Sequence, residues 1–166
     1  MRTLLIGGAL GALVVAFSAC GGSGGSSASD QELQRQADTY AISQIEKDFH
    51  ESMTKKKIDL MMSLWAPNAT FTSGPGKTAT GKAQIRKTWL KSAAFKPDKN
   101  WVADHPAYKV RVTINGDRGT LHFECHFLDV EADKVALVTA ADQDVARIDG
   151  RWLITRMVGS TTELSP

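Results

Sequence analysis

The chain has 166 residues, with 20 Lys or Arg against 18 Asp or Glu and a formal net charge of +2. This near-neutral balance argues against nucleic acid as a partner, because binding phosphates needs a basic face. The part of the chain beyond residue 29 suits a single compact domain, since it is long enough for one hydrophobic core and too short for two.

The first 20 residues predict an export signal. Arg2 precedes an uncharged, apolar and glycine-rich run at residues 4–17, and two small residues follow. The run is shorter than the roughly 20 apolar residues that span a bilayer, so we expect it to be removed. Residues 17–20 (FSAC) resemble a bacterial lipobox, in which the cysteine is lipidated and becomes the first residue, although Phe17 replaces the usual leucine. The alternative is a secreted protein whose cysteine falls at this junction by chance.

A glycine- and serine-rich segment at residues 20–29 predicts a flexible tether. We therefore expect residues 1–19 to be a lipoprotein signal peptide and Cys20 to carry lipid such as palmitate. Residues 30–166 would form a domain held at the cell membrane on its extracytoplasmic side. Cys125 then has no partner in the chain, so we expect no intramolecular disulfide and a small buried residue at this position.

Helical patterns come first in this predicted domain. Ser29 and Glu32 have the spacing of a capping box, and apolar residues then recur at helical intervals as far as Met53. The expected order is a helix ending at residues 55–57, a helix stopped by Pro67, a strand at 69–72, and a helix from 80–81 that ends before Pro97.

Strand patterns follow, because from residue 108 onward apolar and polar residues alternate. The first strand, at 108–114, ends in a turn at 115–117, and three more strands are expected near 119–128, 134–147 and 152–158. Helices followed by a strand meander predict an α+β fold, with the helices packed on one face of a curved antiparallel sheet.

His122, Glu124 and His126 alternate along one predicted strand and so share one face of it. Two imidazoles and a carboxylate could bind a metal. The cross-strand neighbours Lys109 and Arg111 favour the other interpretation, a carboxylate among cations on the polar outer face of the sheet. No metal site is predicted.

A ligand pocket is predicted on the concave face of the sheet. A two-residue turn between the last two strands sets Arg156 opposite Gln143, with Thr139 nearby. Tyr108 would offer a hydroxyl, and Arg156 would offer a bidentate contact to an anion. The walls would come from four aromatic residues: Trp65, Phe71, Trp89 and Phe123. The alternative is that a helix carboxylate pairs with Arg156, which then only fills space.

Several short strings, taken in order, resemble the nuclear transport factor 2-like superfamily, particularly its SnoaL-like branch. They lie at residues 58–71, 81–89, 116–119 and 149–154, and the resemblance covers nearly all of 41–160. It implies a cone-shaped half-barrel with a pocket between helices and sheet, commonly dimeric through the outer sheet face. Members include isomerases, cyclases, dehydratases and domains that only bind, so the fold does not settle the function.

Enzymes of this superfamily generally use an aspartate, or a histidine with an aspartate, inside the cone as a general base. The predicted strand faces place no such group inside, and the nearest ones are Asp104 and His105, expected at the pocket mouth. The preferred hypothesis is a domain that binds a small, partly apolar ligand without a cofactor. The alternatives are an isomerase, dehydratase or cyclase using Asp104 or His105, and an accessory module that meets a protein or a second copy through the outer sheet face near Val138 and Ala140.

Overall fold

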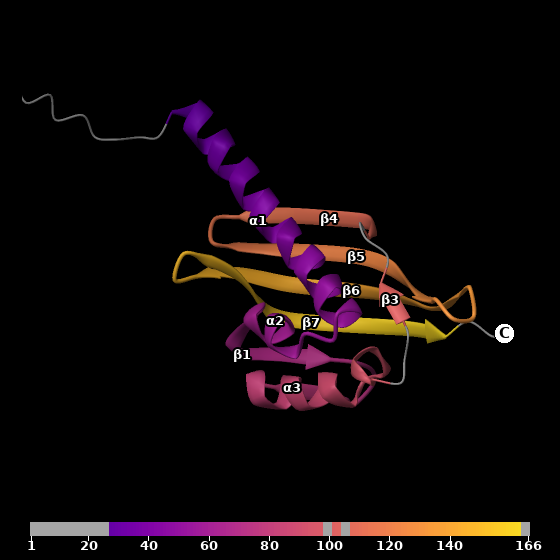
Figure 1. Ribbon diagram of the computed structural model, residues 1–166. Coiled ribbons are helices and arrows are strands. Elements are labelled where there is room, and N and C mark those ends of the chain that lie inside the picture. Colours follow the sequence, from indigo (N-terminus) through magenta and orange to yellow (C-terminus); the bar gives the residue numbers. More distant parts are fainter. Residues whose placement is uncertain (1–26, 98–100, 104–106, 164–166) are drawn as a thin grey trace, which may run out of the picture.

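The computed structural model describes residues 27–97, 101–103 and 107–163, which form helices packed on one sheet (Figure 1). The helices are α1 (Ala28–Thr54), α2 (Ile58–Ser63) and α3 (Lys82–Lys91), followed by the 3₁₀ turn η1 (Ala93–Phe95). The strands are β1 (Trp65–Thr72), β2 (Thr78–Thr80), β3 (Trp101–Ala103), β4 (Tyr108–Asn115), β5 (Arg118–Asp129), β6 (Lys134–Ile148) and β7 (Arg151–Glu163).

The sheet has the order β2-β1-β7-β6-β5-β3, and β4 also pairs with β5. β1 runs parallel to β7, whereas every other pairing is antiparallel, so the sheet is mixed rather than a pure meander. The predicted α+β class is confirmed. Pro67 lies inside β1 and does not stop α2, which already ends at Ser63.

The capping box of α1 lies two residues earlier than predicted. Ser27 is the N-cap: its Oγ accepts from the Asp30 backbone N–H at 3.2 Å, and its own N–H donates to the Asp30 carboxylate at 3.1 Å. Glu32 does not reach back, because its carboxylate accepts hydrogen bonds from Arg35 and Gln36 further along the helix. The helix therefore begins inside the serine-rich segment that was predicted to be flexible.

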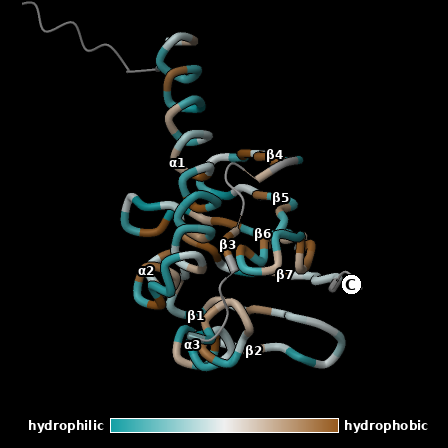
Figure 2. Tube along the Cα trace, turned by 45° about the vertical axis from the view of Figure 1, so that its right-hand side comes forward, coloured by the Kyte–Doolittle hydropathy of each residue, from teal (hydrophilic) through white to brown (hydrophobic). Residues whose placement is uncertain are grey.

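α1 lies across one face of the sheet, and its N-terminal turns stand clear of the rest of the molecule (Figures 1 and 2). Its C-terminal half buries Ile42, Ile45, Phe49 and Met53 against the sheet, at the helical spacing that the sequence predicts. The projecting turns carry exposed Leu33. No helix among the described residues is long and apolar enough to cross a membrane.

A bulge in β7 changes which of its side chains face the core. Trp152 pairs with Arg147 and Ile154 with Val145, as predicted from the turn. The register then shifts by one residue at Thr155, whose hydroxyl donates to the Asp144 carbonyl at 3.0 Å. As a result, Gln143 lies opposite Met157, and the predicted pairing of Gln143 with Arg156 is wrong.

Candidate functional site

A cavity of about 600 Å³ lies between α1, α3 and the inner face of the sheet. Its interior wall is mainly apolar and includes Phe49, Met53, Phe71, Trp89, Phe123 and Phe127. These residues come from α1, β1, α3 and β5, so the cavity depends on the packing of helices against the sheet. Its volume falls in the range of small-molecule pockets, roughly 300–1,000 Å³.

The aromatic wall is held by ring contacts around Trp89. The Trp89 ring stacks on Phe71 with centroids 4.9 Å apart and an interplanar angle of 9°, and it meets Phe49 edge to face at 5.3 Å. Phe49 in turn contacts Phe123 at 5.5 Å. Such contacts fix the ring orientations, so the wall is a preformed apolar surface.

Polar groups gather at the mouth, where the lining residues are exposed. Hydroxyls come from Ser73, Ser160 and Thr161, and the charged groups are Lys77 and Lys91. Among the described residues that line this cavity there is no carboxylate. The site therefore combines an apolar interior with a polar, positively charged mouth.

Four of the predicted pocket residues meet at this cavity: Phe71, Trp89, Phe123 and Thr139. The Thr139 hydroxyl lies 2.8 Å from the thiol of Cys125, which is fully buried as predicted. Trp65 is also fully buried and contacts the Phe71 ring at 5.8 Å, but it supports the wall from behind.

Gln143 is buried outside the cavity lining. Its side-chain amide donates to the Met157 sulfur at 3.7 Å, and its carbonyl oxygen has no hydrogen-bond partner among the residues that the structure describes. The prediction that it contacts a ligand together with Arg156 therefore loses its geometric basis, because the bulge at Thr155 has separated the two side chains.

Arg156 does not face the cone, and the prediction that it does is wrong. Its side chain is 55% exposed, and its guanidinium lies 3.3 Å from the carboxylate of Asp144, the residue opposite it on β6. The predicted contact to an anion inside the pocket cannot come from this residue. The alternative, in which a carboxylate pairs with Arg156, is closer to the structure, although the partner comes from a strand and not from a helix.

The remaining predicted residues cannot be placed. Cys20, Asp104 and His105 lie outside the described residues, and the same holds for the side chain of Tyr108, whose backbone belongs to β4.

The polar outer face of the sheet carries the pairs expected there. Lys109 Nζ lies 2.8 Å from the Glu124 carboxylate and lowers its pKa, mainly through this hydrogen bond. His122 Nδ1 lies 2.7 Å from Asp142 on the neighbouring strand. These contacts confirm the interpretation of Glu124 as a carboxylate among cations.

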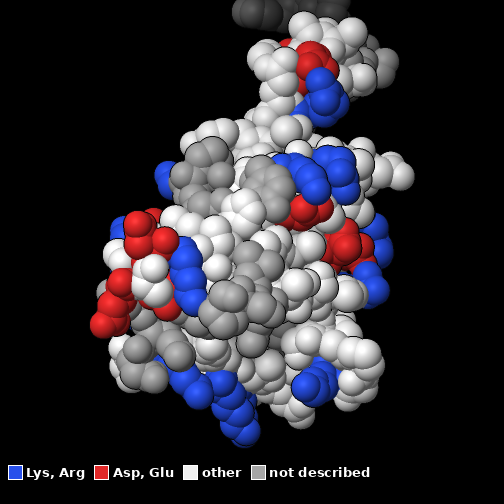
Figure 3. Space-filling view, turned by 90° about the vertical axis from the view of Figure 1, so that its right-hand side faces the viewer, with Lys and Arg blue, Asp and Glu red and all other residues white. Residues whose placement is uncertain are grey.

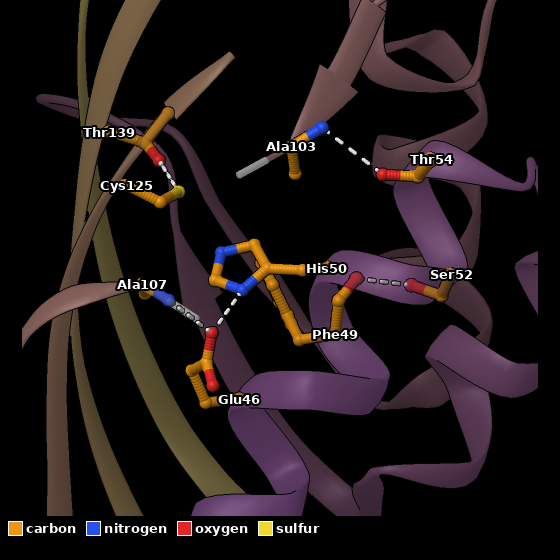
Figure 4. Close-up of polar contacts among 9 residues, drawn as sticks. All are labelled: Glu46, Phe49, His50, Ser52, Thr54, Ala103, Ala107, Cys125 and Thr139. Atoms are coloured by element: carbon orange, nitrogen blue, oxygen red, sulfur yellow. Dashed lines mark hydrogen bonds and ion pairs between the residues drawn. The ribbon is translucent and has the colours of Figure 1, made fainter. Parts of the chain in front are cut away.

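A buried polar pair on α1 was missed by the sequence analysis. His50 and Glu46 are 1% and 4% exposed, and Nδ1 of His50 lies 2.5 Å from the Glu46 carboxylate, which also accepts from the Ala107 backbone N–H at 3.2 Å (Figure 4). His50 Nε2 has no hydrogen-bond partner within the described part of the chain. The two residues are four positions apart in α1 and lie among its buried apolar residues. Two polar residues at this spacing on the apolar side of a helix could have indicated a buried pair from the sequence.

The pair lies one layer behind the cavity wall. The His50 ring contacts the Phe123 ring edge-on, with centroids 5.0 Å apart, and Phe123 lines the cavity. A carboxylate that holds one ring nitrogen fixes the tautomer and orientation of an imidazole, which is the arrangement that general bases use. In the present geometry, however, His50 is not part of the cavity lining.

Comparisons with known proteins agree on the fold. The model of the SnoaL-like domain family matches residues 34–158. An NTF2-like protein with a cystatin-like fold from Novosphingobium aromaticivorans superposes with a TM-score of 0.70 at 15% identity, covering 81% of this chain and 88% of that one. The hexachlorocyclohexane dehydrochlorinase LinA-type3 from Novosphingobium barchaimii has a TM-score of 0.67 at 17% identity, with coverages of 81% and 93%. No curated protein matches the chain in sequence.

Proposed function

The chain belongs to the SnoaL-like domain family, and on that premise we propose that its domain binds a small, largely apolar molecule. The observation that carries this proposal is the cavity of about 600 Å³ with an aromatic wall. Burial of apolar ligand surface contributes roughly 25 cal/mol per Å² before the costs of association, so such a wall favours apolar ligands.

A variant that fills the cavity tests this function. A Cβ atom at Gly159 would lie 3.5 Å from the Phe71 ring and 3.6 Å from the end of Met157, which are ordinary contacts. Both neighbours line the cavity, so the rest of a leucine side chain at this position would occupy it. We expect 1-decanol at about ten times its Kd to raise the Tm of the wild type by roughly 2–8 °C, and to leave Gly159→Leu unchanged.

Thr162→Leu is the matched control for this experiment, because Thr162 is exposed on the same strand and does not line the cavity. It should respond to decanol as the wild type does. A wild type that does not respond, or a Gly159→Leu variant that binds decanol normally, would contradict the proposal.

Acid–base catalysis is a second candidate function, and the pair of Glu46 and His50 favours it. The carboxylate holds the imidazole through Nδ1, and Nε2, which has no hydrogen-bond partner among the described residues, is the nitrogen that would take the proton. One of the similar structures is named a dehydrochlorinase. Because a general base must reach the proton that it removes, this function requires movement of the aromatic wall, since His50 contacts Phe49 and Phe123 but does not itself line the cavity. Binding therefore remains the better supported function.

An accessory role has less support. An accessory module that docks through its outer face needs no ligand cavity, whereas the structure contains one. The outer sheet face, where a protein partner or a second copy would dock, carries the ion pairs of Lys109 with Glu124 and of His122 with Asp142. Charged groups are depleted at the centres of interfaces, so a homodimer through this face has less support than ligand binding.

We further propose that Cys20 anchors the domain to the extracytoplasmic side of the cell membrane. The support is the apolar segment that precedes a lipobox-like string. The N-terminal turns of α1, the first described element after this segment, project away from the body of the domain (Figure 1).

Replacing Cys20 tests the anchor. In a bacterial host, Cys20→Ala should abolish incorporation of a clickable palmitate analogue and release the protein from the membrane fraction. Cys125→Ala is the control, since it removes the buried cysteine and should leave labelling and fractionation unchanged. Labelling that persists in Cys20→Ala, or that is lost in Cys125→Ala, would rule this anchor out.

A further inference from the structure

We infer that the ligand is an amphipathic anion, whose apolar body lies against the aromatic wall and whose charged head group lies at Lys77 and Lys91. This inference rests on the proposed binding function and specifies its ligand class. The observation behind it is that the site has an apolar interior and a polar mouth. Among the described residues that line the cavity, the two charged ones are both lysines.

The two lysines come from different elements that meet at the mouth. Lys77 lies in the turn between β1 and β2, where its backbone N–H donates to Gly74 and its carbonyl accepts from Ser73. Lys91 is the last residue of α3. Both side chains line the cavity and are exposed, and neither forms an ion pair within the part of the chain that the structure describes.

The surroundings of the mouth add positive charge and hydroxyl groups. A shallower depression beside the cavity shares Ser73, Lys77 and Thr88 with it and adds Lys87. The lower part of the face in Figure 3, at the level of α3 in Figure 1, shows basic side chains and no acidic ones. The described residues that line the cavity and this depression include no carboxylate to oppose an anion, and lysine ammonium groups with nearby hydroxyls can bind a carboxylate, sulfonate or phosphate.

The structure also limits where the charge of a ligand can lie. The interior wall offers aromatic and aliphatic side chains, and a buried charge without a partner is strongly unfavourable. Arg156, the residue that the sequence suggested for an anion, points away from the cavity and pairs with Asp144. The head group must therefore remain at the mouth, and the lysines there supply its contacts.

Decanoate and 1-decanol provide the test, because they share an apolar chain and differ in head group. In Lys77→Met/Lys91→Met we expect the ratio of decanoate affinity to decanol affinity to fall about fivefold to tenfold, the scale of two partly exposed charge contacts. Decanol affinity should change little. Added salt should weaken decanoate binding in the wild type and have less effect in the double variant.

The control is Lys47→Met/Lys82→Met, which removes the same net charge at positions outside the cavity lining. Its affinity ratio should equal that of the wild type. An unchanged ratio in Lys77→Met/Lys91→Met, or an equal fall in the control, would overturn the inference. A wild type that binds neither compound would instead overturn the proposed binding function.

Vesicles of phosphatidylglycerol distinguish a free amphiphile from lipid that remains in a bilayer. For a free ligand, cosedimentation of the unlipidated Cys20→Ala protein with vesicles should not depend on Lys77 and Lys91. If their replacement abolishes cosedimentation while the decanoate ratio stays unchanged, the lysines bind membrane head groups and the inferred ligand class is wrong.

Discussion

Asp38→Ala is expected to lower the free energy of unfolding by about 2–4 kcal/mol, because the Asp38 carboxylate joins α1 to the last hairpin. It accepts hydrogen bonds from Arg147 at 2.6 Å, from the Trp152 indole at 3.2 Å and from Gln34 at 3.0 Å. The Arg147 guanidinium also lies 4.8 Å from the centre of the Trp152 ring. Without Asp38, the buried indole N–H and the partly buried guanidinium each lose this partner.

Asp117→Ala is the matched control, since Asp117 pairs with the same arginine at 3.0 Å but its side chain is 78% exposed. Exposed pairs contribute about 0–1 kcal/mol, so urea unfolding should show a much smaller loss for this variant. Equal losses in the two variants would mean that burial of the Asp38 pair is not the cause.

The contribution of Asp38 should also depend on pH. Burial by itself raises the pKa of Asp38, but hydrogen bonds from Arg147, Trp152 and Gln34 outweigh burial and lower it below its usual value. Because the pKa of Asp38 is lower in the folded than in the unfolded state, its ionised form stabilises the fold. This stabilisation is fully present at pH values above the unfolded pKa of about 3.9, and it is lost as the pH falls through the pKa of the folded state. The difference between the wild type and Asp38→Ala should therefore be largest near neutral pH and shrink in acid.

The pair of Glu46 and His50 should show strongly non-additive effects on stability. His50→Leu removes a hydrogen-bond partner from the buried Glu46 carboxylate, and Glu46→Leu leaves the imidazole without its acceptor. Each single variant should lose about 2–4 kcal/mol. The double variant should lose less than the sum by at least about 1.5 kcal/mol, because both polar groups leave together.

A double-mutant cycle in urea measures this coupling, and additive losses would contradict it. The cycle also bears on function. A double variant close to wild-type stability would show that folding does not require the pair, and this result would strengthen the catalytic candidate. A double variant as unstable as the worse single variant would instead assign the pair to the structure of the core.

The class of the fold and the order of the three helices and the long strands could be predicted because they depend on local periodicity, whereas the short strands β2 and β3 were not predicted. Apolar steps identified α1, and alternation identified the strands from residue 108 onward. The parallel pairing of β1 with β7 joins segments far apart in the sequence, and no local pattern specifies it.

The site was only partly predictable for two physical reasons. Phe71, Trp89 and Phe123 were correctly placed because large aromatic residues on amphipathic elements face the core. Arg156 was misplaced because β-branched Thr155 is an ordinary strand residue and gives no sign of a bulge. Lys77 and Lys91 were missed because their meeting at one cavity mouth depends on how a turn and a helix end pack together.

The extra residue at Thr155 shifts, by one position along β7, which side chains face the core. Ile154 and Met157 are both buried although they are an odd number of positions apart, which an uninterrupted strand does not allow. If the bulge were absent, Arg156 would take the inward position opposite Gln143, and the buried layer beside the cavity would hold a guanidinium in place of a thioether. One residue of strand length thus decides between a neutral and a cationic interior, without any change in the identity of the side chains around it.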